Sequence, residues 1–178
     1  MTLSRRHFLA SGAAGTAVFG LGQFPAFAGT PAMPDWHLGY TSAPAGGFDP
    51  EPMRLVFGQE PRGLKGCLYR NGPAQFLYGK DDFGRHWFDG DGMVQRIAIA
   101  DGKAVHSGRF VQTTKRRIEQ ANGKFMAPGF GTAGDPDFPV SGPDDVNAAN
   151  TSVIVIDGKL YALWEGGSAF TMDATTLE

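Results

Sequence analysis

Two Asp-Gly pairs constrain the fold of this chain more than any other feature. The first lies in the run IAIADGKAVHS (Ile97–Ser107) and the second in IVIDGKLYAL (Ile154–Leu163). A type I′ turn needs positive φ at both central residues, so Asp-Gly between two β-rich runs is a strong hairpin signal. We therefore predict two β-hairpins, whose Asp-Gly pairs begin at residues 101 and 157. Hairpins that recur with an inserted loop suggest, without proving, the blades of a β-propeller.

Glycine and proline punctuate the rest of the chain. The 178 residues include 26 glycines and 12 prolines, which favour many short strands over a helical bundle. A long loop, Met126–Asn150, separates the two hairpins. No partner strand follows the last β-rich run, so open sheet edges remain and the sequence predicts an incomplete all-β domain. Strands are expected at Gly66–Arg70, Met93–Ala100, Ala104–Thr113, Ser152–Ile156, Leu160–Trp164 and Ala169–Met172.

The N-terminus has the pattern of an export signal. A twin-arginine pair, Arg5 and Arg6, precedes a weakly apolar, glycine-interrupted run that ends in Ala26-Phe27-Ala28. We predict a twin-arginine signal peptide over residues 1–28, and hence export by the twin-arginine machinery to the periplasm or the cell exterior. Residues 29–52 are rich in Pro, Gly, Ala and Ser and are predicted to form an extended arm. Residues 53–178 would form the folded part.

The most conspicuous polar stretch is RHWFDGDGMV (Arg85–Val94). It lacks the ligand spacing of an EF-hand, and His86 has no second His or Cys at zinc-site spacing. Asp89 and Asp91 leave a catalytic carboxylate pair open in principle. Asp-Gly-Asp-Gly before a strand is more often turn chemistry, so we interpret the stretch as a structural turn.

Other patterns for known chemistry are weak. The net charge is −2 and the Lys and Arg residues are scattered, so nucleic-acid binding is not expected. The sequence has no Gly-rich phosphate loop and no nucleophile elbow. We interpret Cys67, in an apolar run, as a buried small residue. The basic run TTKRRIEQ (Thr113–Gln120) is interpreted as a solvated strand end.

Several short motifs in a fixed order resemble the N-terminal part of a carotenoid cleavage oxygenase. Each motif alone is modest, but together in this order they are specific, and they cover the chain from about Leu64 to its last residue. They are LYRNGP (Leu68–Pro73), HWFDGDGMV (His86–Val94), GRFVQT (Gly108–Thr113), Glu119, ANTSVI (Ala149–Ile154), KLYALWEGG (Lys159–Gly167) and MDATTLE (Met172–Glu178).

The resemblance implies a seven-bladed β-propeller, of which this chain would hold the first one or two blades. A non-haem iron(II) ion lies on the axis of such a propeller, bound by four histidines, and three glutamates orient three of their rings. These enzymes deliver dioxygen to a conjugated double bond of a carotenoid, an apocarotenoid or a stilbene. The histidines at positions 7, 37, 86 and 106 match no ligand motif. The ligands are therefore expected beyond Glu178, and the chain alone is expected to bind no iron and to be inactive.

Three site residues carry over from the resemblance. Glu165 in ALWEGG resembles the first of the glutamates that orient a ligand histidine. Thr151, fourteen residues earlier, resembles a threonine whose methyl group lies beside a vacant iron position. Trp164 resembles a residue that faces the substrate tunnel, where an aromatic ring would stack on a polyene. HWFDGDG resembles a segment that is structural in this family, so no active-site role is expected for His86.

Two alternatives remain open. The chain could be an exported, non-catalytic binding module built of β-hairpins, without the iron site. The whole protein could also use the same scaffold for isomerisation or for hydrolysis of a retinoid-like ester. The apolar, conjugated substrate raises the question of membrane contact, but the aromatic residues of the arm are too sparse to predict an anchor.

Overall fold

The computed structural model describes residues 35–60, 62–79 and 85–178, with the side chains of 35–37 left aside. The predicted signal peptide, residues 1–28, lies outside the described residues, and so does the arm up to residue 34. No helix in the described part is long and apolar enough to cross a membrane.

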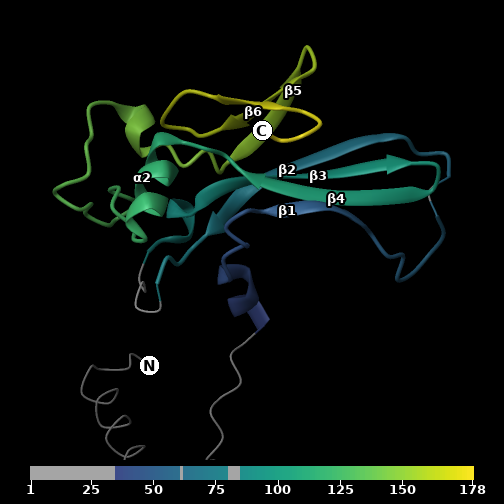
Figure 1. Cartoon of the computed structure of the whole chain (residues 1–178), viewed down its shortest axis with the longest axis horizontal. Helices are drawn as coiled ribbons and strands as arrows, with labels where there is room; N and C mark the ends of the chain where they lie inside the picture. Colours follow the sequence, from purple (N-terminus) through teal and green to yellow (C-terminus); the bar gives the residue numbers. More distant parts are fainter. Residues whose placement is uncertain (1–34, 61, 80–84) are drawn as a thin grey trace, which may run out of the picture. The chain divides into compact units, whose positions relative to one another are not determined.

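The first sheet has four antiparallel strands in the order β1-β4-β3-β2 (Figure 1). They are β1 (Phe48–Pro52), β2 (Gly66–Gln75), β3 (Asp91–Ala100) and β4 (Lys103–Phe110). The predicted hairpin between β3 and β4 is confirmed, because Asp101 and Gly102 both have positive φ, 52° and 78°. The sequence predicts an unpacked arm up to Pro52, whereas its last five residues are the edge strand β1, paired with β4.

The second sheet has three antiparallel strands in the order β5-β6-β7. They are β5 (Ser152–Ile156), β6 (Lys159–Leu163) and β7 (Phe170–Asp173). The predicted turn at Asp157 and Gly158 is also confirmed, with φ of 50° and 76°. A short 3₁₀ helix, η1 (Asp35–Tyr40), precedes β1, and two more, η2 (Trp87–Asp89) and η3 (Pro143–Val146), lie between later strands. The described chain is therefore mostly β-sheet, as predicted.

One predicted element is wrong. The basic run expected as a solvated strand end is helix α2 (Thr114–Asn122). Thr113 caps its first turn by accepting the Arg116 backbone N–H at 3.1 Å, and Gly123 ends it with φ of 62°. Lys115 and Arg116 are buried rather than solvated, because carboxylates face them.

A second correction concerns Cys67, which is exposed rather than buried. It lies in the first half of β2, where Gly66 and Leu68 are exposed as well. Since neighbouring residues of a strand point to opposite faces, both faces of this strand end are open in the described part.

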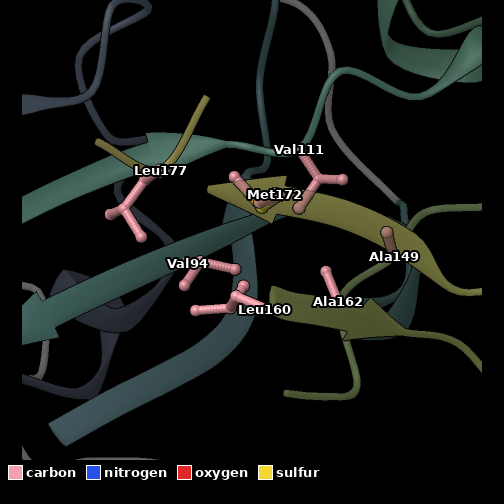
Figure 2. Packing of buried hydrophobic residues seen from close by; sticks show 7 residues of the cluster. All are labelled: Val94, Val111, Ala149, Leu160, Ala162, Met172 and Leu177. Atoms are coloured by element: carbon pink, nitrogen blue, oxygen red, sulfur yellow. The ribbon is translucent and has the colours of Figure 1, made fainter. Parts of the chain in front are cut away.

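The main apolar core joins the two sheets (Figure 2). Val94 of β3 packs with Leu160 and Ala162 of β6 and with Met172 of β7, and the cluster is completed by Val111, Ala149 and Leu177. Asn71 of β2 adds polar links, since its side-chain N–H groups donate to the carbonyls of Ala149 and Ser152 at 2.8 Å each.

The backbone at Ala148–Ala149 lies directly against the start of β3. Gly92 donates its N–H to the Ala148 carbonyl at 2.8 Å. A Cβ at position 92 would overlap the Ala149 carbonyl, so only glycine allows this approach. The second glycine of the Asp-Gly-Asp-Gly stretch thereby fixes the chain just before Thr151.

Candidate functional site

A cavity of about 700 Å³ is the candidate site. Its lining is dominated by aromatic and other apolar side chains, which suits a flat, apolar ligand. All three residues predicted from the sequence, Thr151, Trp164 and Glu165, line it. The structure therefore brings the predicted residues together.

Thr151 and Glu165 meet at the base of the β5–β6 hairpin. The pairing of Ser152 with Leu163 sets the register, and the Thr151 N–H donates to the Leu163 carbonyl at 3.1 Å. The Thr151 hydroxyl then donates to Oε2 of Glu165 at 2.7 Å. Both side chains are exposed, and the other Glu165 carboxylate oxygen has no hydrogen-bond donor among the described residues.

Trp164 is held by the shape of the turn that follows β6. A Cβ at position 166 would lie 2.6 Å from Cζ3 of the Trp164 ring. Real Cβ atoms do not approach this closely, so Gly166 leaves the space in which the ring rests. The half-buried ring therefore lies over Gly166 and forms part of the cavity lining.

Another part of the cavity lining comes from the stretch interpreted as a structural turn. His86 caps η2, accepting the Phe88 N–H through Nδ1 at 3.2 Å, so the turn interpretation is correct. The stretch also lines the cavity through Trp87, Phe88 and Asp89. The segment therefore forms part of the cavity wall, and His86 is not among the lining residues. Adjacent large aromatics beside a glycine-rich turn were the available signal.

His86 organises an exposed aromatic group on that side. Its ring centroid lies 4.6 Å from that of Phe88 and 4.5 Å from that of Phe130. Phe88 is 60% exposed and Phe130 is 64% exposed, although both are large and apolar. Phe130 belongs to the long loop and was missed by the sequence reasoning, because nothing local in GFG marks it as lining a cavity.

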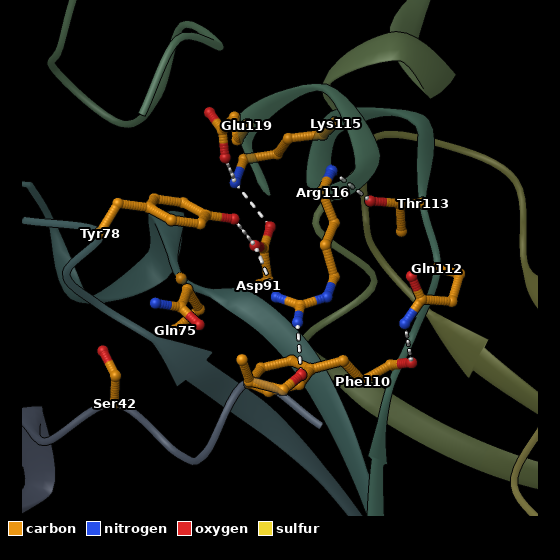
Figure 3. Close-up of polar contacts among 12 residues, drawn as sticks. Ser42, Gln75, Tyr78, Asp91, Phe110, Gln112, Thr113, Lys115, Arg116 and Glu119 are labelled. Atoms are coloured by element: carbon orange, nitrogen blue, oxygen red, sulfur yellow. Dashed lines mark hydrogen bonds and ion pairs between the residues drawn. The ribbon is translucent and has the colours of Figure 1, made fainter. Parts of the chain in front are cut away.

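A buried cluster of charges adjoins the cavity, since Lys115 is also one of the lining residues. Figure 3 shows the contacts of this cluster. Lys115 bridges Asp91 and Glu119, with N–O distances of 2.7 Å to each carboxylate. Arg116 lies 3.3 Å from the second Asp91 oxygen, which also accepts the Tyr78 hydroxyl at 3.0 Å. Asp91 is thus fully engaged, which supports a structural role over a catalytic one.

The pKa values of two groups reflect this cluster. Burial alone lowers the pKa of Lys115, but the carboxylates of Asp91 and Glu119 outweigh it and raise the pKa above its usual value. Burial and the nearby negative charge of Asp91 raise the pKa of Tyr78 far above its usual value. Lys115 is therefore charged and Tyr78 neutral over the physiological pH range.

The described residues include no group of three or more His, Cys, Asp or Glu side chains that could hold a metal ion. His86 caps a helix, and Nε2 of His106 lies 3.1 Å from the side-chain oxygen of Gln95. Four imidazoles cannot be assembled from these positions. The described residues therefore do not form an iron site by themselves.

Known proteins resemble the chain in sequence and fold. The family model described as retinal pigment epithelial membrane protein matches residues 44–178. The apocarotenoid-15,15'-oxygenase of Synechocystis sp. is 36% identical over 147 residues, covering 80% of this chain and 29% of that enzyme. The lignostilbene-alpha,beta-dioxygenase isozyme III of Sphingomonas paucimobilis is 37% identical over 124 residues, covering 69% of this chain and 25% of that enzyme.

Solved structures agree. Cobalt-substituted Synechocystis apocarotenoid oxygenase aligns with a TM-score of 0.68 and 35% identity, over 80% of this chain and 30% of that chain. Two other solved forms of that oxygenase are variants, one altered at a glutamate and one at a threonine fourteen residues before it. The chain spans less than a third of the length of these relatives. The motif resemblance is confirmed, and the chain belongs to the retinal pigment epithelial membrane protein family, that of the carotenoid cleavage oxygenases.

Proposed function

We propose that this chain is the N-terminal part of an exported non-haem iron(II) dioxygenase that cleaves a conjugated C=C bond of a carotenoid, apocarotenoid or stilbene-like substrate. The observation that carries the proposal is the Thr151–Glu165 hydrogen bond at the edge of an aromatic-lined cavity. The sheets described above would be the first blades of a seven-bladed propeller.

Residue spacing supports the assignment of Thr151 and Glu165. They are fourteen residues apart, as are the altered threonine and glutamate of the Synechocystis oxygenase variants. Glu165 keeps one carboxylate oxygen without a donor among the described residues. That oxygen would accept the ring N–H of a ligand histidine and fix its tautomer and orientation. Thr151 would hold the carboxylate in place for this task.

The cavity supports the proposed substrate class. Aromatic rings of Phe88 and Phe130 line one side and the Trp164 ring lies on another part of the wall. Offset stacking of such rings on a planar conjugated chain stabilises binding without requiring polar groups on the ligand. The residues of this chain would bind and orient the substrate and exclude water from it.

Iron(II) would supply the dioxygen chemistry of the cleavage. Its four histidine ligands are proposed to come from parts of the whole protein that this chain does not contain, since the chain covers less than a third of each of these relatives. By itself the chain would bind no iron and would be inactive.

The test uses the protein as its gene encodes it. We expect about one iron per protein and, with isotopically labelled dioxygen, aldehyde or ketone products that carry the label, from an apocarotenoid or from resveratrol. With a retinoid ester as a further substrate, label-free isomers or free retinoid alcohol would favour isomerisation or ester hydrolysis instead. Tight substrate binding with neither iron nor products would favour the non-catalytic binding module.

Export is proposed separately from catalysis. A twin-arginine signal at residues 1–28 would carry the protein, folded around its iron, to the periplasm or the cell exterior. Fractionation of cells that produce the natural protein and an R5K/R6K variant tests this. Retention of the variant in the cytoplasm is expected, and equal export of both forms would contradict the signal. Sedimentation of the exported protein with lipid vesicles tests membrane contact at the substrate entry. Without such sedimentation, membrane contact is no longer part of the proposal.

A further inference from the structure

The long loop contributes Phe130 to the cavity, and its course is set by two buried carboxylates. We call Met126–Phe130 the tethered segment. Near its start, one oxygen of Glu119 accepts the N–H groups of Met126 and Ala127, at 2.9 and 2.8 Å. Glu119 is 0% exposed, so these hydrogen bonds form away from water. Hydrogen bonds to a buried charged acceptor are among the stronger ones in proteins.

The other end of the tethered segment is held by Asp89. Its Oδ1 accepts the Phe130 N–H at 2.7 Å, and its Oδ2 accepts the His86 N–H at 3.3 Å. The segment lies so close that a Cβ at Gly129 would be 2.5 Å from Cγ of Asp89. One carboxylate thus connects the backbone of Phe130 to that of His86, whose ring contacts Phe130.

Charge balance explains why the carboxylate of Glu119 keeps its place. The second Glu119 oxygen is 2.7 Å from Lys115, which also pairs with Asp91. Arg85 adds a link by donating to the Ala127 carbonyl at 2.7 Å. The tethered segment is therefore fixed by side chains from α2, from η2 and by that of Arg85, although the segment has little regular structure of its own.

We propose that Asp89 and Glu119 are positioning residues that hold Phe130 against His86 and Phe88, and thereby set the shape of the cavity for a planar conjugated ligand. Neither carboxylate is required to touch the ligand for this effect. The proposal rests on the proposed function for the class of ligand only. Phe130 is 64% exposed, and the aromatic rings that it contacts among the described residues are those of His86 and Phe88, so the tethers of its backbone determine where its ring lies.

The experiment is a double-mutant cycle on the protein as its gene encodes it, with all-trans-retinol as the probe and quenching of tryptophan fluorescence as the measurement. Asp89→Asn keeps the shape of the side chain but replaces one carboxylate oxygen by an NH₂ group. An N–H donor then faces the N–H of either Phe130 or His86, which is a donor as well. We expect it to weaken retinol binding about tenfold. In a Phe130→Ala background, the same change should alter binding by less than about twofold, since the ring that it positions is gone. Equal effects in both backgrounds would overturn the proposal.

Asp135→Asn is the matched control. Asp135 lies in the same loop and also accepts a backbone N–H, that of Asp137 at 2.9 Å, but it does not line the cavity. We expect no change in retinol binding. Glu119→Gln gives an independent version of the test, which decides the question if Asp89→Asn does not fold by near-ultraviolet circular dichroism.

Hydrogen exchange separates this inference from the proposed function. If the natural protein does not bind retinol at all, the proposed ligand class fails. The exchange rate of the Phe130 amide hydrogen then tests whether Asp89 holds the tethered segment in place. A faster rate in Asp89→Asn but not in Asp135→Asn supports it, and unchanged rates in both variants overturn it.

Discussion

The two sides of the cavity are held in opposite ways. The first wall, residues 87–89 and 128–130, rests on buried carboxylates and on the ion cluster of α2. The second wall, Thr151 with residues 164–166, is the open base of a hairpin, where the Thr151–Glu165 hydrogen bond is exposed. The first wall is built to keep aromatic rings in place. The second leaves the carboxylate of Glu165 exposed.

This difference predicts where mutations separate stability from function. A charge buried among other charges is expensive to leave without a partner, because no water replaces the lost one. An exposed hydrogen bond is readily replaced by water. Changes under the first wall should therefore lower the free energy of unfolding, and changes in the second should leave stability nearly unchanged but alter activity.

The largest effect is expected from Lys115→Met. It keeps the length of the side chain but leaves the carboxylates of Asp91 and Glu119 buried and facing each other without their shared cation. We expect a loss of about 3–5 kcal/mol in the free energy of unfolding, measured by urea titration. Lys124→Met is the matched control, since Lys124 also forms an ion pair at 2.7 Å, with Asp135, but is exposed. No measurable loss is expected there. Similar losses in both variants would remove the distinction between buried and exposed pairs.

Alkaline pH should weaken the first wall next. The pKa values of Lys115 and Tyr78 are higher in the folded chain than the ordinary values of 10.5 and 10.0. Above about pH 10 the unfolded chain releases these protons while the folded chain keeps them, so unfolding is favoured as pH rises. Below that pH both states hold the protons and the contribution is complete. Each group adds a slope of about 1.4 kcal/mol per pH unit.

The measurement is the unfolding free energy at about pH 9 and about pH 11, for the natural protein and for Tyr78→Phe. The variant has no phenol to titrate, so its stability should fall less steeply. An identical slope would show that Tyr78 does not carry the alkaline sensitivity.

A pair of glycine substitutions compares the walls directly. Gly129→Ala would force a Cβ against the carboxylate of Asp89, which is anchored, and should destabilise the protein by about 1–3 kcal/mol. Gly166→Ala would instead push against the ring of Trp164, which is only half-buried and can move. We expect nearly unchanged stability with retinol binding weakened about threefold. The reverse pattern, with Gly166→Ala the more destabilising, would assign rigidity to the second wall.

The second wall was predictable from the sequence and the first was not, for a physical reason. Asp-Gly fixes a hairpin by local backbone geometry, and the register of that hairpin brings Thr151 to Glu165 once both are suspected from the motif resemblance. Helix α2 carries no such local signal, because Ile118 is its only large apolar residue and its buried face is charged. Its burial depends on Asp91, 24 residues before Lys115, and on backbone groups of a loop. Partners this far away in the sequence leave no periodic pattern. A threonine at the start and a glycine at the end were the available clues to the helix itself.

The smallest effect on stability, and the sharpest test of the second wall, is expected from Thr151→Val. The substitution keeps the shape of the side chain and removes only the hydroxyl donor to Glu165, which water can replace at an exposed site. The free energy of unfolding should change by less than about 1 kcal/mol. If Glu165 orients an iron ligand in the whole protein, turnover or iron affinity should nevertheless fall about tenfold, because a ligand ring is only as well oriented as the carboxylate that holds it.

Thr176→Val is the control, since Thr176 also donates to an exposed carboxylate, that of Asp173 at 3.2 Å, and does not line the cavity. It should leave iron content and turnover unchanged. If Thr151→Val is as active as the natural protein, the hydroxyl of Thr151 does not support the function of Glu165. Their hydrogen bond would then be a feature of the hairpin alone.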